Sequence, residues 1–266
     1  MKMKRSASNP HRTKAKKNDS SWGKVAPWYD TLLESGIDTY QTQVILPNLL
    51  RVLALRPGEK VIDIACGQGF FTRAFREAGA TTVGADISKE LIALARKQSP
   101  REMSFYVAPA HELRFAADEV YDTALLVLAI QNIEEIDATF REVRRVLAPG
   151  GRLVLVLNHP TFRVLKHSSW GYDENADIQY RRIERYLSGE KVFIDMHPGK
   201  KDSVQTISYH RSLQDISKSL RKNGFAIARL EEWISHRVSG AGPRQKAEDT
   251  ARKEIPLFMM LETVKL

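Results

Sequence analysis

Two aspartates and two glycines between residues 63 and 86 have the types and the spacing of a nucleoside-binding site. Gly67 and Gly69 lack a Cβ atom, so the backbone can turn sharply there and a ligand can lie directly on it. Asp63 comes just before this turn. Asp86 ends the next apolar stretch, where a carboxylate can accept hydrogen bonds from both hydroxyls of a ribose. The combination indicates a nucleoside-like cofactor.

The elements that position these residues follow from the surrounding pattern. Residues 60–64 are short, β-branched and mostly apolar, which predicts a strand buried on both faces. Residues 70–78 carry apolar side chains at helical spacing and precede Gly79, a common helix end. Residues 81–85 predict a second strand. A strand, a tight turn, a helix and a second strand that ends in an acid belong to the ligand edge of a parallel sheet.

Two common nucleotide sites fit this turn poorly. A dinucleotide fingerprint needs a small third residue where Thr72 stands, and Phe70 and Phe71 crowd the turn. A phosphate loop would end in Gly-Lys-Ser/Thr, which does not follow here. The turn therefore indicates neither NAD nor a nucleoside triphosphate.

Two motifs together resemble a known family. Residues 61–69 are similar to the first motif, and residues 143–153 to the helix, turn and fifth strand, of the class I S-adenosylmethionine-dependent methyltransferases. Within that family the chain resembles the small-molecule group (methyltransferase type 11) that includes the ubiquinone and menaquinone C-methyltransferases. The resemblance extends from about residue 22 to residue 266. It implies a single Rossmann-like α/β domain with a seven-stranded, mostly parallel sheet of order 3-2-1-4-5-7-6, an antiparallel last strand and helices on both faces.

The resemblance also implies S-adenosyl-L-methionine as cofactor and S-adenosyl-L-homocysteine as product. The amides after Gly67 suit the methionine carboxylate, Asp63 the ammonium side, Asp86 the ribose diol and Ile87 one adenine face. Where the family often has an acid for the adenine amine, this chain has Pro109, so adenine recognition falls to the backbone near Ala110 and to His111. The predicted cofactor residues are Tyr29, Asp63, Ala65, Gly67, Gln68, Gly69, Asp86, Ile87, Ala110, His111, Leu128 and Gln131.

Two of these predictions have structural alternatives. Gln131 and Asn132 follow the apolar strand 123–128 and could hold the methionine tail or a substrate oxygen, but Asn132 could instead cap a helix near Glu134. Tyr29 lies in the aromatic segment 22–30, which resembles a lid over the cofactor and could equally pack its rings on the core.

The connection after the fifth strand is long. Residues 158–211 form an insertion that starts at the ligand edge, and connections of this length are usually functional. Residues 176–187 predict a short helix, and residues 192–196 and 204–209 predict a β-hairpin. We expect this helix and hairpin to form a cap that selects the substrate. The whole expected domain covers residues 20–266.

Methyl transfer from a sulfonium mainly requires an aligned nucleophile and, where needed, a base that titrates near neutrality. His159 follows the fifth strand directly and is the first candidate base; Tyr209 and His210 are the second. Each of these could instead be a structural hydrogen-bonding residue. No cluster of histidines and carboxylates has metal-ligand spacing, so we expect no metal.

Composition adds limits. The only cysteine is Cys66, which excludes an internal disulfide framework, and no apolar run approaches the roughly 18 to 20 residues of a membrane span, so we expect a soluble, cytoplasmic protein. Seven of the nine net positive charges lie in residues 1–17, within an expected disordered tail of residues 1–19. This tail could be a solvated leader, an arm for nucleic acid or an anionic surface, or a transit segment.

The sequence therefore predicts a methyltransferase that acts on an O, N or C nucleophile of a small molecule. An RNA methyltransferase that uses the basic tail, and a non-catalytic S-adenosylmethionine-binding protein, are the alternatives. The acceptor and the oligomeric state stay open.

Overall fold

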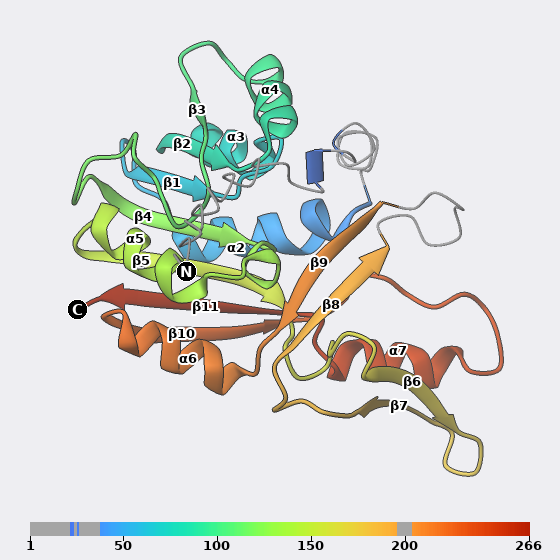
Figure 1. Cartoon of the computed structure of the whole chain (residues 1–266). Helices are drawn as coiled ribbons and strands as arrows, with labels where there is room; N and C mark the ends of the chain where they lie inside the picture. Colours follow the sequence, from blue (N-terminus) through green and yellow to red (C-terminus); the bar gives the residue numbers. More distant parts are fainter. Residues whose placement is uncertain (1–21, 24–25, 27–37, 196–203) are drawn as a thin grey trace, which may run out of the picture.

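The computed structural model describes residues 22–23, 26, 38–195 and 204–266. Its centre is a seven-stranded sheet with the strand order β10-β11-β5-β4-β1-β2-β3 (Figure 1). Neighbouring strands from β5 to β3 are parallel, and β11 is antiparallel to both β5 and β10. The predicted sheet order and the antiparallel last strand are thus confirmed. The strands are β1 (Lys60–Ile64), β2 (Thr81–Asp86), β3 (Ser104–Val107), β4 (Tyr121–Val127), β5 (Leu147–Asn158), β10 (Phe225–Trp233) and β11 (Phe258–Lys265).

Helices cover the sheet because each places an apolar stripe against it. Phe140 and Leu220 bring α5 and α6 into one buried cluster with β4 and β5, and Leu49 and Phe75 bring α2 and α3 into a second cluster. A smaller cluster around Phe105 joins α4 to β3. The helical elements are η1 (Gln41–Ile45), α2 (Leu46–Leu53), α3 (Phe70–Glu77), α4 (Lys89–Gln98), η2 (Ile130–Asn132), α5 (Ile136–Val146), α6 (Leu213–Lys222) and α7 (Gln245–Glu254).

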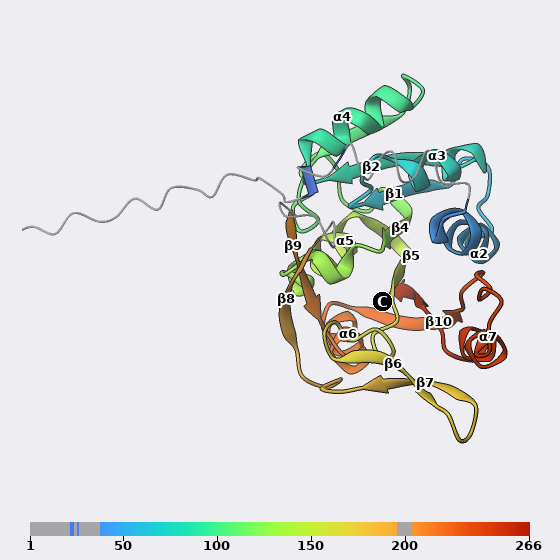
Figure 2. The same ribbon diagram turned by 90° about the vertical axis from the view of Figure 1, so that its right-hand side faces the viewer.

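The long connection after β5 forms two hairpins. The predicted hairpin is present as β8 (Glu190–Asp195) and β9 (Gln205–His210), which pair antiparallel. The helix predicted over residues 176–187 is wrong, because this segment is β7 (Ile178–Ile183), paired antiparallel with β6 (Ser168–Asp173). Figure 2 shows the β6–β7 hairpin on the side of the molecule that carries α7. The described part of the insertion is therefore built from strands, and its role as a cap over the site stays a prediction.

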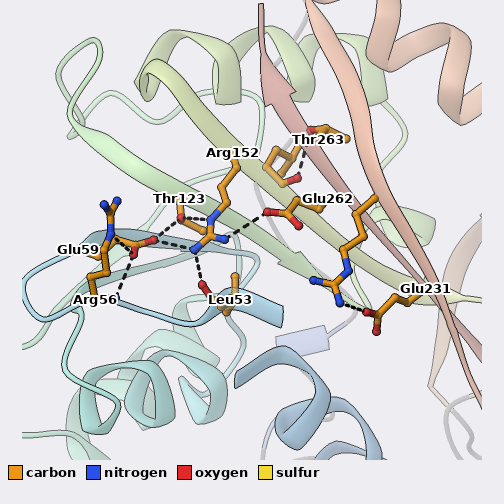
Figure 3. A network of polar contacts seen from close by, with 10 residues as sticks. Leu53, Arg56, Glu59, Thr123, Arg152, Glu231, Glu262 and Thr263 are labelled. Carbon is orange, nitrogen blue, oxygen red and sulfur yellow. Dashed lines mark hydrogen bonds and ion pairs between the residues drawn. The ribbon is translucent and has the colours of Figure 1, made fainter. Parts of the chain in front are cut away.

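A polar network ties the amino ends of the parallel strands together, at the edge opposite the predicted site (Figure 3). Arg152 on β5 donates from Nε to Thr123 Oγ1 (2.9 Å) and from Nη1 to Glu262 Oε1 (3.2 Å). Its Nη2 donates to Leu53 O (2.6 Å) and to Glu59 Oε1 (3.0 Å). One guanidinium thus connects α2, β4, β5, β11 and the residue before β1.

Candidate active site

The turn between β1 and α3 is wound tightly by left-handed backbone conformations. Ala65 and Gly67 both have φ 58°, and Gly69, the first residue before α3, has φ 84°. A Cβ atom on Gly69 would lie 2.9 Å from the Phe105 ring, so the neighbouring packing also requires glycine there. Such conformations cost free energy for residues other than glycine, and Ala65 therefore carries backbone strain at this turn.

Asp86 is fixed against this turn at the end of β2. Its Oδ2 accepts a hydrogen bond from the Gly67 amide (3.0 Å) and its Oδ1 accepts one from the Ser88 amide (2.8 Å). Burial raises the pKa of the carboxyl, although the three backbone amides that bond it act in the opposite direction. The three amides leave one acceptor position of the carboxylate free, so a hydroxyl of a diol that enters the cleft can donate to Asp86.

Asp63 lies at the neighbouring strand end, on β1. Thr72 Oγ1 donates to its Oδ2 over 2.6 Å, and the side chain is almost fully buried. Burial, helped by the negative charge of Asp86, raises the pKa of Asp63 to about 7. A cation placed beside it would favour the ionised carboxylate.

These two carboxylates line one pocket, which we name the aspartate cleft. Its walls are apolar apart from the two acids and Asn132, and no lysine, arginine or histidine is among its described lining residues. The cleft therefore suits a ligand with a cation and hydroxyls but no phosphate. Its lining comprises Trp22, Asp63, Ala65, Cys66, Gly67, Phe71, Asp86, Ile87, Leu91, Val127, Leu128, Ala129, Asn132 and Ile133.

A second pocket, which we name the Gln131 pocket, lies on the other side of η2. Gln131 Nε2 donates to Leu128 O (2.7 Å), while its Oε1 is buried without a hydrogen-bond partner. Ser208 on β9 donates to Gln131 O (3.4 Å), so the second hairpin closes this pocket. Asn158, Arg163, Tyr209 and His210 are further lining residues.

Part of the chain that contains this arrangement is similar to a known protein family. Residues 62–155, which contain the turn, Asp63, Asp86 and η2, match the family described as "Methyltransferase domain". Residues 62–155 are thus similar to a methyltransferase domain. The cofactor that this similarity implies is S-adenosylmethionine, and the cleft fits it: one acid for an ammonium, one for a ribose diol, apolar walls for adenine and no basic group among the described lining residues for a phosphate.

Relatives and solved structures agree with this family. The chain is 33% identical over 133 residues to a demethylmenaquinone methyltransferase of Corynebacterium kroppenstedtii, which covers 50% of this chain and 55% of the relative. It is 34% identical over 134 residues to the one of Mycobacterium marinum, with 49% and 54% covered. The chain thus spans about half the length of these curated relatives. An S-adenosylmethionine-dependent methyltransferase structure from Mesorhizobium loti has a TM-score of 0.64 and 26% identity, covering 82% of this chain and 96% of the other.

Of the cofactor residues predicted for the methyltransferase domain, half line the cleft: Asp63, Ala65, Gly67, Asp86, Ile87 and Leu128. Gln68 and Gly69 lie within the turn, where Gln68 Oε1 accepts from Arg73 Nη2 (2.7 Å). Ala110 packs against the core and His111 is exposed, and neither lines the cleft. Tyr29 lies outside the described residues.

The two neighbouring amides of η2, Gln131 and Asn132, line different pockets. Gln131 lines its own pocket, whereas Asn132 lines the aspartate cleft. The alternative that Asn132 caps the next helix is wrong, because α5 begins at Ile136 and is preceded by Glu135 without a side-chain cap. Sequence reasoning did not single out the apolar wall residues Phe71, Leu91 and Ile133, whose helical or turn positions looked like ordinary core.

His159, the first candidate base, is buried beside β5 and away from the cleft lining. Its Nε2 lies 2.7 Å from Glu232 Oε1, and its Nδ1 accepts from the amides of Thr161 (3.3 Å) and Phe162 (3.4 Å). Since Nδ1 accepts, the neutral ring holds its proton on Nε2 and donates it to Glu232. Burial lowers the pKa of His159, partly opposed by Glu232.

Tyr209 and His210, the second candidates, lie together on β9 and both line the Gln131 pocket. The Tyr209 hydroxyl donates to Glu134 Oε2 (2.8 Å), and burial raises the pKa of this phenol. His210 Nε2 is 2.7 Å from Tyr186 O, to which it donates. These side chains are therefore next to the pocket but already hydrogen-bonded.

Two kinds of feature are absent from the described residues. No three histidine, cysteine or acidic side chains gather there as a metal-binding group. In the same residues, no helix has the length and apolar character to cross a membrane.

Proposed function

We propose that the protein transfers the methyl group of S-adenosylmethionine to a small-molecule acceptor bound in the Gln131 pocket. The observation that carries this proposal is the meeting of Asp63 and Asp86 in one cleft, beside an open glycine turn and with no basic side chain among the lining residues that the structure describes. The methyltransferase domain match supports it. The names of the curated relatives support a quinone-like ring as the acceptor class.

In this proposal the cleft residues bind and orient. S-adenosylmethionine, when bound, supplies a methyl group on a sulfonium that is already activated for displacement. Asp63 would hold the ammonium side and Asp86 the ribose diol, while Trp22 and Phe71 exclude water from the cleft. Fixing the donor in this way converts an encounter in solution into an aligned reaction, which is where most of the rate enhancement would arise.

The Gln131 pocket contains hydrogen-bonding groups that could hold the molecule that accepts the methyl group. The unpaired Gln131 Oε1 can accept a hydrogen bond from an acceptor hydroxyl or amine, and Asn158 and Tyr209 add further polar groups. η2 lies between the two pockets, because its residue Gln131 lines one and Asn132 the other. An acceptor held by Gln131 would thus face the turn that borders the donor. The proposal includes an O, N or C atom as the nucleophile of this acceptor.

The cofactor part is tested by calorimetry with S-adenosylmethionine and S-adenosylhomocysteine. We expect Asp63→Ala and Asp86→Ala each to weaken binding at least tenfold, because each loses a charge-assisted hydrogen bond. Asp122→Ala is the matched control: this aspartate accepts from the Lys60 amide (2.8 Å) at the opposite edge of the sheet. Equal affinities in all four proteins, or no binding by the parent, would refute the assignment of the cleft.

The acceptor class is tested by transfer of labelled methyl groups. We expect label to enter a small-molecule extract and not total RNA when both are offered to the full chain. Label in RNA would support the RNA methyltransferase alternative. Cofactor binding without transfer to either pool would support a non-catalytic binding protein.

A further inference from the structure

A third pocket lies where the loop after β5, the β6–β7 hairpin, the end of α7 and the approach to β11 meet. Three arginines line it, Arg163, Arg181 and Arg252, and its described lining residues include no aspartate or glutamate. We name it the arginine pocket. Like charges that share a pocket without a counter-ion repel one another, so the fold concentrates positive charge at this place.

Arg163 is the least compensated of the three. It is half-buried, and its guanidinium has no hydrogen bond or ion pair with any described residue. Burial lowers its pKa. A desolvated cation without a partner is costly, whereas the comparable Arg152 is neutralised by Glu59 and Glu262.

Neutral groups orient the other two arginines and leave their charges available. Arg181 donates from Nε to Phe162 O (2.9 Å) and from Nη2 to Ser168 Oγ (2.7 Å), and it lies over the Trp170 ring at 5.1 Å. Arg252 donates from Nε to Ser239 Oγ (3.1 Å). Pre-oriented guanidinium groups are the usual means of binding a carboxylate or phosphate in two-point fashion.

The arginine pocket adjoins the acceptor side of the site, because Arg163 lines both it and the Gln131 pocket. Its other walls include the rings of Tyr40, Phe162 and Trp170. All of these residues lie outside residues 62–155, the part matched to the methyltransferase family. The feature therefore belongs to the region that would set acceptor choice.

We propose that the arginine pocket binds an oxyanion, a carboxylate or a phosphate, carried by an aromatic methyl acceptor. The proposal rests on the proposed function, and it narrows the acceptor from any small ring compound to an anionic one. Arg163 faces the anion from the acceptor side, Arg181 and Arg252 complete the cationic wall, and the rings supply apolar contact.

Benzoate and phenyl phosphate are suitable probes, titrated by calorimetry into the full chain saturated with S-adenosylhomocysteine. We expect at least one of them to bind, with the tighter one identifying carboxylate or phosphate as the preferred group. Arg163→Ala and Arg252→Gln should each weaken that binding about tenfold, and rising salt should weaken it in the parent. The matched control is Arg182→Gln on the same strand as Arg181, because Arg182 is exposed and pairs with Glu184; it should change binding less than twofold.

The outcomes separate this inference from the function on which it rests. Failure of the parent to bind S-adenosylhomocysteine refutes the proposed function. Binding of S-adenosylhomocysteine without binding of either probe, or equal effects of Arg252→Gln and Arg182→Gln, overturns the arginine pocket alone. If Arg163→Ala does not fold, Arg163→Lys replaces it: the point charge remains but the two-point geometry is lost, so probe affinity should still fall. Unchanged probe affinity in a folded Arg163→Lys and in Arg252→Gln also overturns it.

Discussion

Asp63 and Asp86 show how a single side chain acquires a role from its place at a strand end. Both could be predicted from sequence, because an acid beside a glycine turn and an acid after the next strand must meet where parallel strands end. Their ionisation could not be predicted in the same way. The pKa of Asp63 depends on how completely the fold buries the carboxyl and on its distance from Asp86. Both are properties of the tertiary structure.

A pH dependence of cofactor binding follows from Asp63. The pKa of about 7 in the unliganded fold lies above the ordinary value, so the carboxyl is largely protonated below that pH. A bound ammonium favours the ionised form, so S-adenosylhomocysteine affinity should rise about tenfold between pH 6 and pH 8 and then level off. For the same reason the unliganded fold should lose stability as the pH rises from about 4 to 7.

Asp63→Asn is the control for this profile. It cannot ionise, so its calorimetric affinity should be weaker and flat between pH 6 and pH 8. A profile that keeps the parent's slope in Asp63→Asn would assign the titration to another group.

His159 has two competing roles, and one substitution distinguishes them. The prediction that it acts as a base requires a free nitrogen, whereas Nε2 and Nδ1 are both hydrogen-bonded. We expect His159→Ala to lower the free energy of unfolding by about 1–3 kcal/mol, because Glu232 and the Thr161 and Phe162 amides lose their partner. The pH profile of turnover, measured once an acceptor is known, should stay unchanged. If a stably folded His159→Ala variant lost the alkaline plateau of the turnover profile, His159 would instead be the catalytic base.

At the scale of elements, β7 shows where pattern reading failed. The segment Ile178–Ile183 places exposed and half-buried residues alternately, which is the period of a strand. Its charged residues are also compatible with the polar face of a helix. A helix makes its backbone hydrogen bonds within itself, whereas this segment makes them with β6. The turn between them is built locally, with the Asn175 and Ala176 amides both donating to Asp173 Oδ1. Pairing partners of short, exposed hairpins are decided by such contacts and not by apolar periodicity.

The same limit explains which pockets could be predicted. The aspartate cleft arises from consecutive strands and their turns, so its acids were found. The arginine pocket joins Arg163 from the loop after β5, Arg181 from β7 and Arg252 from α7. Nothing in the local pattern of any one of them indicates the other two.

Arg152 tests how the elements are held together at the edge remote from the site. Arg152→Ala should lower the free energy of unfolding by about 3 kcal/mol, because the buried Glu59 loses the closer of its two ionic partners, Arg152 at 3.0 Å and Arg56 at 3.7 Å. The Thr123 hydroxyl and the Leu53 carbonyl also lose donors. Denaturant unfolding measures this. Arg114→Ala is the comparison: Arg114 is exposed and pairs with the exposed Glu112, so its effect should be smaller. A larger loss in Arg114→Ala would mean that the network shown in Figure 3 is not a main junction of the sheet.

On the scale of the whole molecule, charge and function are distributed unequally. Residues 1–17 hold seven of the nine net positive charges and lie outside the described residues, so contact of this tail with nucleic acid or an anionic surface stays a prediction. Within the described fold, one half carries the cofactor cleft and the matched family segment. The other half, the acceptor half, contains β6 to β9 and α7 and carries the arginine pocket. The Gln131 pocket lies between the halves, because it is lined by Ile130, Gln131 and Ile136 from the matched segment and by Ser208, Tyr209 and His210 from β9. In the proposed function, the acceptor is therefore bound where the two halves meet.

Because the cleft is lined from β1, β2, β4, α3 and α4 together, a bound cofactor should stabilise the entire sheet and not only its edge. A ligand that binds only the folded state at 100 times its Kd adds about 2.7 kcal/mol. For a domain of this size each kcal/mol raises Tm by about 2–4 °C, so S-adenosylhomocysteine should raise Tm by about 5–10 °C. The shift should grow with the logarithm of ligand concentration in a single transition, and it should vanish in an Asp63→Ala/Asp86→Ala double variant that remains folded. Two separated transitions, of which only one moves with ligand, would show that the cleft and the acceptor half unfold independently, and the two pockets could then not be kept in the fixed alignment that methyl transfer requires.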